Sequence, residues 1–455
     1  MYKKETYQNR RSALKKTLGT GLALFIGNDE AGCNYAGNTY PYRQDSTFLY
    51  FFGQPYAGLS AIIDVDEDRE IIFGDELTID DIIWVGAQPS LQEKCVAAGI
   101  EELMPVNTIV DYLKQAAQKG RVIHYLPTYR PEHQLKLWSW LGVHPGEEKS
   151  SVDFIKAVVN LRNYKSDEEV AEIEKACLVT AEMHLAAMRV IRPGIHEYEV
   201  VAAIEAAASS HNCPLAFPII ATVNGQTLHN HYHGNPVNSG DLFLIDAGAE
   251  TEMGYAGDMS STTPADRRFT TRQRDIYRIQ TAMHDRSVEA LAPDVRFEDV
   301  YDLSARTLIE GMKNLGLMRG DTEEALAAGA YALFYPHGLG HMLGLDVHDM
   351  ENLGEEYVGY DDRPKSKQFG RASLRLGRKL KPGFVHTIEP GIYFIPELID
   401  KWKAEKLHTE FINYELVETY KDFGGIRNEE DYLITTSGAR MLGKRIPRTV
   451  EEMEG

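Results

Sequence analysis

Apolar and polar positions alternate along the first 160 or so residues in a way that predicts several short strands and helices. The apolar run 22–26 predicts a short buried strand that ends at Gly27. The runs 59–64 and 70–73 flank three acidic residues at 66–68, a pattern that predicts a β-hairpin. This part of the chain therefore starts as a sheet-forming region.

Further along, the segment 121–126 predicts another strand before Pro127, and 131–140 predicts a helix. Strands that alternate with helices indicate an α/β domain, with helices packed on a sheet. Nothing in this stretch gathers histidines and carboxylates as a catalytic centre would.

A domain boundary is predicted close to residue 165. Ser166 followed by Glu169 is a capping-box pattern, which satisfies free N–H groups at a helix start. An apolar stripe then runs to Ile191, and a second helix is expected over 197–211. His184 lies on that stripe and is expected to pack in the core rather than bind metal. The chain should divide into domains 1–163 and 164–455.

Charge and cysteine content limit the class of protein. Asp and Glu number 68 against 48 Lys and Arg, which gives a formal charge of −20. This balance argues against nucleic acid or an anionic membrane as partner, since both attract basic surfaces. The four cysteines are scattered without framework spacing, and no apolar run reaches 18 residues. We expect a soluble cytoplasmic protein.

The first candidate for chemistry is a hairpin that carries two aspartates. The apolar run before Asp246 predicts a buried strand, and a turn around 251–254 would return the chain and set Asp258 beside Asp246. Two like charges held so close are costly unless a proton or a cation offsets them. A turn aspartate and a capping aspartate are the alternative interpretation.

The second candidate is a histidine-rich segment, in which His337, His341 and His348 fall within twelve residues. The glycines between them allow unusual backbone geometry or the close approach of another group. The segment is not HExxH, so a helical zinc-peptidase site is disfavoured.

Two further carboxylates end apolar segments. Glu389 stands just before a Pro-Gly turn. Glu429 comes two residues after Arg427, so on a strand Arg427 and Glu429 would share one face. Each signal alone is weak. Together with Asp246, Asp258 and His341 they amount to four carboxylates and one imidazole.

That donor set suits hard or borderline divalent cations such as Mn²⁺, Co²⁺ or Fe²⁺, and it lacks the thiolates of a structural zinc site. Four negative charges are too many for one ion but suit two. Two cations about 3.5–4 Å apart can share a water and generate hydroxide near neutral pH, which makes amide hydrolysis the natural use.

With these motifs together, the whole sequence resembles the pita-bread metallopeptidases and, among them, the Xaa-Pro aminopeptidases (aminopeptidase P). The carboxyl-terminal half resembles the catalytic domain, with ligands in the order Asp246, Asp258, His341, Glu389 and Glu429. The segment 40–53 is similar to the most recognisable block of the creatinase-like α/β domain that precedes it. The resemblance implies an α/β (α+β) fold, with that domain followed by a pita-bread domain.

The resemblance also implies a role for each matching residue. Asp258 and Glu429 would bridge two divalent cations, with Mn²⁺ favoured and Co²⁺, Fe²⁺ or Zn²⁺ as alternatives. Asp246 would complete one coordination sphere, and His341 and Glu389 the other. Glu389 would also pass a proton from the metal-bridging hydroxide to the leaving amine. The remaining implied catalytic and substrate-binding residues are His348, His337, Arg427, His229 and Tyr393.

Three departures from the family pattern are visible. Asp246 and Asp258 are one residue further apart than in compact members, so a bulge or a longer turn is expected. Ser261 replaces an arginine, and the segments 351–381 and 394–424 are longer. His231 and His233 compete with His229 for its implied role.

The expected activity is removal of the first residue from peptides with proline in second position, since the X–Pro amide has no N–H and a fixed φ. A prolidase, limited to Xaa-Pro dipeptides, is the first alternative, and a methionine aminopeptidase is disfavoured by the large amino-terminal domain. A non-catalytic pita-bread binding module is the alternative from another class, but such modules lose ligands. The resemblance implies a homodimer or homotetramer.

Overall fold

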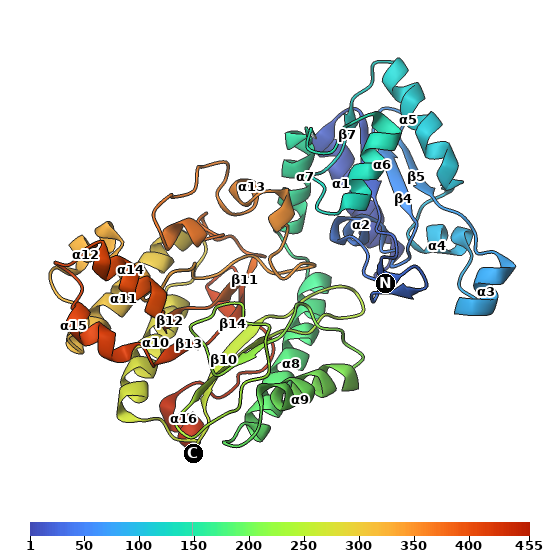
Figure 1. Ribbon diagram of the computed structural model, residues 1–455. Helices are drawn as coiled ribbons and strands as arrows, with labels where there is room; N and C mark the ends of the chain where they lie inside the picture. The colour runs from blue at the N-terminus through green and yellow to red at the C-terminus, as the bar shows by residue number, and fades with distance from the viewer. Residues whose placement is uncertain (148) are drawn as a thin grey trace. The chain divides into compact units, whose positions relative to one another are not determined.

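The structure, a computed structural model, describes residues 1–147 and 149–455 and divides them into two compact units (Figure 1). The first unit contains residues 1–162 and 350–357, and the second contains residues 163–349 and 358–455. The expected domain division at 163/164 stays a prediction. It does not describe the short segment 350–357, which groups with the first unit.

The first unit is built on a mixed five-stranded sheet in the order β6-β5-β4-β1-β7. Its strands are β1 (Leu22–Ile26), β4 (Ser60–Asp64), β5 (Arg69–Phe73), β6 (Glu102–Met104) and β7 (Ile123–His124). A separate small hairpin contains β2 (Gly32–Tyr35) and β3 (Asn38–Thr39). The helices are α1 (Lys4–Leu18), α2 (Ser46–Phe52), α3 (Ile79–Val85), α4 (Leu91–Ala97), α5 (Ile109–Gln118), α6 (Pro131–Leu141) and α7 (Val152–Arg162).

The local predictions for this unit are largely confirmed. Strand β1 has the predicted bounds, and β4 and β5 form the predicted antiparallel hairpin, with Asp68 in the left-handed region of its turn. Helix α6 ends one residue later than expected. Strand β7 is shorter than the predicted 121–126 and pairs only with the start of β1, through Ile123 and His124.

Helix α1 was not expected, because its sequence is too basic for an apolar stripe. Arg11 is fully buried there and donates to the carbonyl oxygens of Phe51 and Ala98 and to the carboxylate of Glu70. Its guanidinium thus satisfies backbone acceptors from distant segments, which is how a basic residue becomes part of a core.

The second unit contains three small sheets flanked by long helices (Figure 1). Its strands are β8 (Ile220–Thr222), β9 (Leu242–Ala247), β10 (Met259–Pro264), β11 (Val385–Ile388), β12 (Gly391–Phe394), β13 (Gly424–Arg427), β14 (Glu430–Ile434) and β15 (Ala439–Met441). The sheets have the orders β10-β9-β8, β11-β14-β15 and β12-β13. All of these pairings are antiparallel.

Two helix pairs cover these strands. The pair α8 (Asp167–Val190) and α9 (Glu197–Ser210) packs on β8, β9 and β10, whereas α10 (Thr271–Glu289), paired with α11 (Phe297–Asn314), packs on β11, β12 and β13. The shorter helices are α12 (Thr322–Ala328), α13 (Glu355–Gly359), α14 (Pro396–Ala404), α15 (Tyr414–Val417) and α16 (Val450–Glu454). The predicted capping box at Ser166 and Glu169 starts α8.

Among the residues described, no helix combines the length and the apolar character needed to cross a membrane.

Candidate metal centre

All of the predicted site residues except Tyr393 line one cavity in the second unit. The residues that line it are Leu228, His229, Asp246, Asp258, His337, Gly338, Gly340, His341, His348, Ser373, Arg375, Glu389, Arg427 and Glu429. They come from segments that are far apart in sequence, so the cavity depends on how the sheets are assembled.

The β9–β10 hairpin places the two aspartates on one face. Asp246 is paired with Ser260, and Asp258 stands two residues before Ser260, so both carboxylates project from the same side. The pairing of Glu250 with Ala256 keeps the register of Asp246 with Ser260. The extra residue expected between the aspartates is therefore taken up by a longer turn, and the hairpin has no bulge.

His341 is placed by backbone pairing with the strand that leads to Glu389. Thr387 N donates to His341 O at 3.0 Å, and Glu389 N donates to Leu339 O at 2.8 Å. Gly340 makes this approach feasible, because a Cβ there would lie 2.2 Å from the carbonyl oxygen of Thr387. Of the two expected reasons for the glycines, close approach of another segment is the one that applies at this position.

Glu429 lies in the short link between β13 and β14 and is bound to β10. Its backbone N donates to Ser260 O at 2.9 Å, and the Ser260 hydroxyl donates to Glu429 Oε2 at 2.7 Å. Ser260 thereby holds Glu429 next to the two aspartates of the hairpin.

These side chains form a compact donor set. His341 Nε2 lies 3.4 Å from Asp258 Oδ2 and 3.6 Å from Glu389 Oε1. One ligand atom from each of Asp258, His341 and Glu429 falls within 4.8 Å of the others, a grouping that could hold a metal ion. Within the described chain, the buried Oδ1 atoms of Asp246 and Asp258 have no hydrogen-bond partner.

The electrostatics of the cluster are unfavourable without a cation. Burial, followed by repulsion from Asp246 and other neighbouring carboxylates, raises the pKa of Asp258 well above its ordinary value. Burial and then Asp258 do the same to the pKa of Glu429, and burial raises the pKa of Glu389. Crowded, desolvated carboxylates with open oxygens fit divalent cations, which would offset both penalties.

Arg427 organises one wall of the cavity. Its guanidinium donates to Asp246 Oδ2 at 2.6 Å, to the Tyr393 hydroxyl at 2.8 Å and to Ser260 Oγ at 2.8 Å. The Tyr393 hydroxyl in turn donates to His337 Nε2, at 2.9 Å, because the proton of that neutral ring is on Nδ1. His337 Nδ1 then donates to Gly338 O, so this chain of bonds selects one neutral tautomer of the ring.

The same surroundings keep His337 neutral. Burial, followed by the charge of Arg427, lowers the pKa of His337 to about 3. His337 is therefore neutral at physiological pH and can exchange hydrogen bonds without adding charge to the centre.

The other two predicted histidines also line the cavity. His348 packs edge-on against His341, with ring centroids 4.2 Å apart. His229 lines the cavity, whereas His233 Nε2 donates to Ile219 O, and His231 is exposed on the surface. This placement favours His229 over its two competitors.

Tyr393 differs from the other predicted residues. Its side chain is fully buried behind the wall, in contact with Arg427 and His337. Its expected contact with substrate stays a prediction, and the contacts that it does make are those of a residue that orients its neighbours.

Several residues of the centre had no sequence prediction. Ser260 connects Arg427 with Glu429, and Asp431 Oδ2 accepts from both Asp258 N and Cys177 Sγ at 3.0 Å. Asp431 could have been found by its place two residues after Glu429. Arg375 and Ser373 come from the charged segment 351–381, where no local pattern separates them from surface residues.

His184 behaves as expected for a core histidine. It is fully buried, with Nδ1 2.8 Å from Ser261 Oγ and Nε2 3.2 Å from Ala247 O. The serine that departs from the family pattern thus contacts this ring.

The comparisons with known proteins agree on one family. Residues 171–436 match metallopeptidase family M24, and residues 7–124 match the aminopeptidase P N-terminal domain. The chain is 30% identical to the Xaa-Pro aminopeptidase of Escherichia coli, over 99% of this chain and 97% of that protein. It is also 30% identical to the Xaa-Pro dipeptidase of Homo sapiens, over 91% of this chain and 84% of that protein.

Solved structures show the same relationship. The proline aminopeptidase P II of Yersinia pestis superposes with a TM-score of 0.82 at 27% identity, covering 100% of this chain and 99% of that one. A zinc-substituted E. coli aminopeptidase P in complex with product gives 0.79 at 28% identity, covering 100% and 98%. The expected fold class, an α/β amino-terminal domain followed by a pita-bread domain, is confirmed.

Proposed function

The chain belongs to metallopeptidase family M24, and from that premise we propose that it hydrolyses the first peptide bond of substrates whose second residue is proline. As a member of this family it is a metal-dependent hydrolase. The finer assignment, to an Xaa-Pro aminopeptidase that acts on peptides longer than two residues, is supported by full-length likeness to proteins of that name.

The observation that carries the proposal is the convergence of Asp246, Asp258, His341, Glu389 and Glu429 on one cavity. Four carboxylates and one imidazole suit two divalent cations, and the open Oδ1 atoms of both aspartates are supporting evidence within the described residues. We propose Asp258 and Glu429 as the residues shared between two ions, with Asp246 on one side and His341 and Glu389 on the other.

Two bound cations would supply Lewis-acid polarisation of the scissile carbonyl and a lower pKa for the attacking water. The chain's own residues would supply the proton transfer. Glu389 would accept the proton that water loses as its oxygen bonds to the carbonyl carbon. It would return that proton to the proline nitrogen as the C–N bond breaks.

The remaining cavity residues would hold the peptide. His348 and His229 would donate hydrogen bonds to the peptide around the scissile bond, and neutral His337 would line the floor beside them. Arg427 would keep Asp246 oriented through its 2.6 Å contact. Proline selectivity is proposed to rest on His229, His348, Arg427 and Tyr393 and on the segments around them.

A second candidate, an Xaa-Pro dipeptidase, is favoured by one feature of the cavity. Arg375 lines it, and a guanidinium there could pair with the carboxylate that a dipeptide carries directly after its proline. The human relative is named an Xaa-Pro dipeptidase, so both activities occur among relatives of similar identity.

A single comparison separates the two candidates. Mn²⁺-loaded protein is given an Xaa-Pro dipeptide, an Xaa-Pro-Xaa tripeptide, and an Xaa-Ala-Xaa tripeptide as control. We expect release of the first residue from the Xaa-Pro-Xaa tripeptide and little from the control. Cleavage of the dipeptide alone would make the protein a dipeptidase. In that case Arg375→Gln should lose activity on the free dipeptide, whereas its activity on an amidated dipeptide should equal that of wild type.

Mn²⁺ is the proposed native metal, because oxygen-rich sites with one imidazole suit harder cations. Co²⁺, Fe²⁺ and Zn²⁺ remain alternatives, and the zinc-substituted relative supports the last of these. Metal analysis of protein purified without added metal tests this choice.

A homodimer or homotetramer is also proposed. Helix α3 leaves large apolar side chains in solvent, among them Trp84, Ile83 and Ile79, which are 87%, 70% and 70% exposed. Contiguous exposed apolar side chains commonly mark an interface.

A cytoplasmic location is proposed as well. In the described part of the chain, Cys33, Cys95, Cys177 and Cys213 form no disulfide, as in proteins of reducing compartments.

A further inference from the structure

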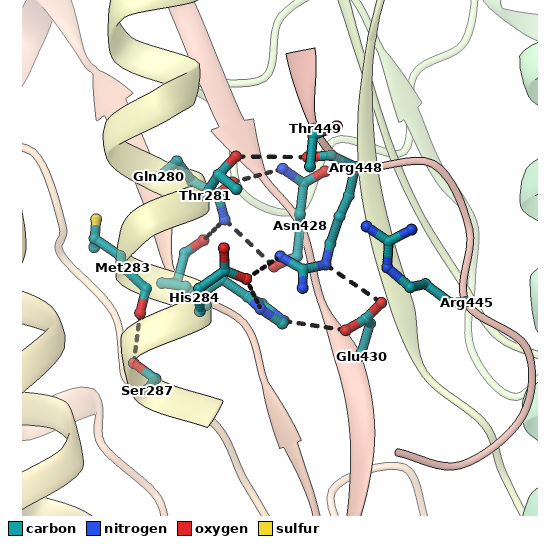
Figure 2. Close-up of polar contacts among 12 residues, drawn as sticks. Gln280, Thr281, Met283, His284, Ser287, Asn428, Glu430, Arg445, Arg448 and Thr449 are labelled. Atoms are coloured by element: carbon teal, nitrogen blue, oxygen red, sulfur yellow. Dashed lines mark hydrogen bonds and ion pairs between the residues drawn. The ribbon is translucent and has the colours of Figure 1, made fainter. Parts of the chain in front are cut away.

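Behind the cavity wall, two buried amide side chains connect three backbone segments by hydrogen bonds. Thr262 N donates to Asn428 Oδ1 at 3.2 Å, and Asn428 Nδ2 donates to Gln280 Oε1 at 2.5 Å. Gln280 Nε2 in turn donates to Pro390 O at 2.7 Å. Figure 2 shows Gln280, on α10, pointing toward Asn428 from the facing segment.

The direction of this hydrogen-bond chain is set by its two ends. A backbone N–H can only donate and a proline carbonyl can only accept, so each amide must present its oxygen toward Thr262 and its NH₂ toward Pro390. A carboxylate or an apolar side chain at position 280 cannot replace the glutamine. Position 280 therefore needs a side chain with both an acceptor and a donor, which an amide supplies and a side chain that only fills space does not.

The three connected segments are those that bear proposed metal ligands. Pro390 directly follows Glu389, Asn428 directly precedes Glu429, and Thr262 lies on β10, which begins directly after Asp258. Side chains alternate along an extended segment, so Arg427 and Glu429 can face the cavity while Asn428 faces α10. Gln280 and Asn428 therefore act on the opposite side of the same backbone that presents the ligands.

Burial makes these hydrogen bonds consequential. Gln280 is fully buried and Asn428 is 3% exposed. Removal of the Gln280 amide would leave Pro390 O and one Asn428 donor unsatisfied away from water, and each would then keep its full desolvation penalty. The segments can avoid that cost only by moving, and such a movement would displace Glu389 and Glu429.

The next residue along the strand is also restrained. Glu430 accepts from the Tyr432 hydroxyl at 2.6 Å. Figure 2 shows Arg448 beside Glu430, and Arg448 Nε lies 3.5 Å from Glu430 Oε1. Both neighbours of Glu429, Asn428 and Glu430, are thus held on the side away from the cavity.

We propose that Gln280 is a positioning residue for the metal centre, which sets the spacing of Glu389 and Glu429 by holding Pro390 O and Asn428 at once. The proposal rests on the proposed function, in which Glu389 and Glu429 hold divalent cations. Gln280 itself contacts neither the cavity nor a proposed ligand side chain, and it acts through the backbone.

The test measures Mn²⁺ binding and does not depend on turnover. Metal-free wild-type protein, Gln280→Met and Gln280→Glu are titrated with Mn²⁺ by calorimetry, and each is melted with and without Mn²⁺. Methionine has a similar volume without polar atoms, and an ionised glutamate has the same shape without the donor. Since burial raises a carboxyl pKa, all titrations are run at the alkaline end of the range in which the wild-type protein binds Mn²⁺. Ser287→Ala is the matched control, because Ser287 is fully buried on the same helix and its hydroxyl donates only within it, to Met283 O.

We expect both Gln280 variants to bind Mn²⁺ about 10–100-fold more weakly than wild type, the usual effect of losing a residue that orients metal ligands. The rise in melting temperature on adding Mn²⁺ should shrink with it. Ser287→Ala should lower the melting temperature of the metal-free protein and leave Mn²⁺ affinity unchanged. If Gln280→Met does not fold, the Mn²⁺ affinity of Gln280→Glu tests the proposal by itself.

Two outcomes would overturn the proposal. Wild-type Mn²⁺ affinity in a folded Gln280 variant refutes it, as does an equal loss of affinity in Ser287→Ala. If the wild-type protein itself binds no Mn²⁺, the proposed function is wrong and the role of Gln280 falls with it. If the wild-type protein binds Mn²⁺ and a folded Gln280 variant binds it equally well, the role of Gln280 alone is wrong.

Discussion

The guanidinium of Arg427 lies 2.6 Å from Oδ2 of Asp246, and among the described residues Oδ1 of the same aspartate has no hydrogen-bond partner. One oxygen is therefore neutralised by a fixed cation, while the other is buried without a hydrogen-bond partner in the described part of the chain. This asymmetry leaves the centre with carboxylate oxygens that an added cation can satisfy, and the first prediction follows from it.

Asp258→Asn should separate metal binding from folding. The change removes a carboxyl group whose pKa is held well above normal by burial and by Asp246. The metal-free protein should therefore gain roughly 1–3 kcal/mol of stability. Activity and the stabilisation by Mn²⁺ should both be lost. Urea unfolding with and without Mn²⁺ measures this, with the exposed Glu289→Gln as control. A metal-free variant less stable than wild type would contradict the electrostatic account.

Asp431 should make the metal-free protein less stable as pH rises. Burial raises its pKa from an ordinary 3.8 to about 7. A raised folded-state pKa contributes stability below the unfolded value and loses it as pH rises through the folded value, here between about 4 and 7. Asp431→Asn keeps the oxygen that accepts from Asp258 N and Cys177 Sγ. Its stability relative to wild type should therefore grow across this window, by up to about 1.4 kcal/mol per pH unit. Parallel pH profiles of the two proteins would rule this out.

Tyr393→Phe should weaken catalysis without removing the metal. The hydroxyl accepts from Arg427 and is left to donate to His337, so its loss releases both residues from their present orientation. We expect kcat to fall about 5–30-fold, as for the loss of one or two hydrogen bonds of about 1 kcal/mol each, with Mn²⁺ content unchanged. Steady-state kinetics and metal analysis on the same sample test this, and loss of Mn²⁺ would instead place Tyr393 among the residues that support the ligands.

His184→Ala should affect stability alone. The substitution removes a fully buried ring and leaves Ser261 Oγ and Ala247 O without their contacts, at a cost of about 2–4 kcal/mol. Two Mn²⁺ per chain should still bind. Thermal unfolding and calorimetric stoichiometry check the two parts, and a reduced stoichiometry would show that His184 is more than a core residue.

Helix α3 should be part of a subunit interface. Trp84→Glu places a charge where 87% of the side chain is exposed, and it should reduce the mass of the assembly measured by light scattering. Asp80→Asn, on the same helix, should leave the mass unchanged. An unchanged mass in Trp84→Glu would assign the oligomer to another surface.

Local patterns in the sequence were sufficient for much of the fold. The apolar run of β1, the β4–β5 hairpin and the capping box at Ser166 depend on residues within a few positions of one another, so periodicity and turn chemistry predict them. The proposed ligands were also visible, because each ends an apolar segment or lies in a glycine-rich one.

What the sequence could not determine depends on partners far apart in the chain. Buried Arg11 in α1 contacts Phe51, Glu70 and Ala98, and Tyr393 is enclosed between Arg427 and His337. Arg375 resembles any other charged loop residue until the fold brings it to the cavity.

The chain by itself thus determined which residues could hold cations, since residue type and local strand pattern are encoded at short range. Only the tertiary structure decided how they are held. Ser260, Gln280 and Asn428 act through hydrogen bonds to segments more than 100 residues away. A buried polar side chain is stable only where such a partner meets it, and no local pattern reports where that partner will be.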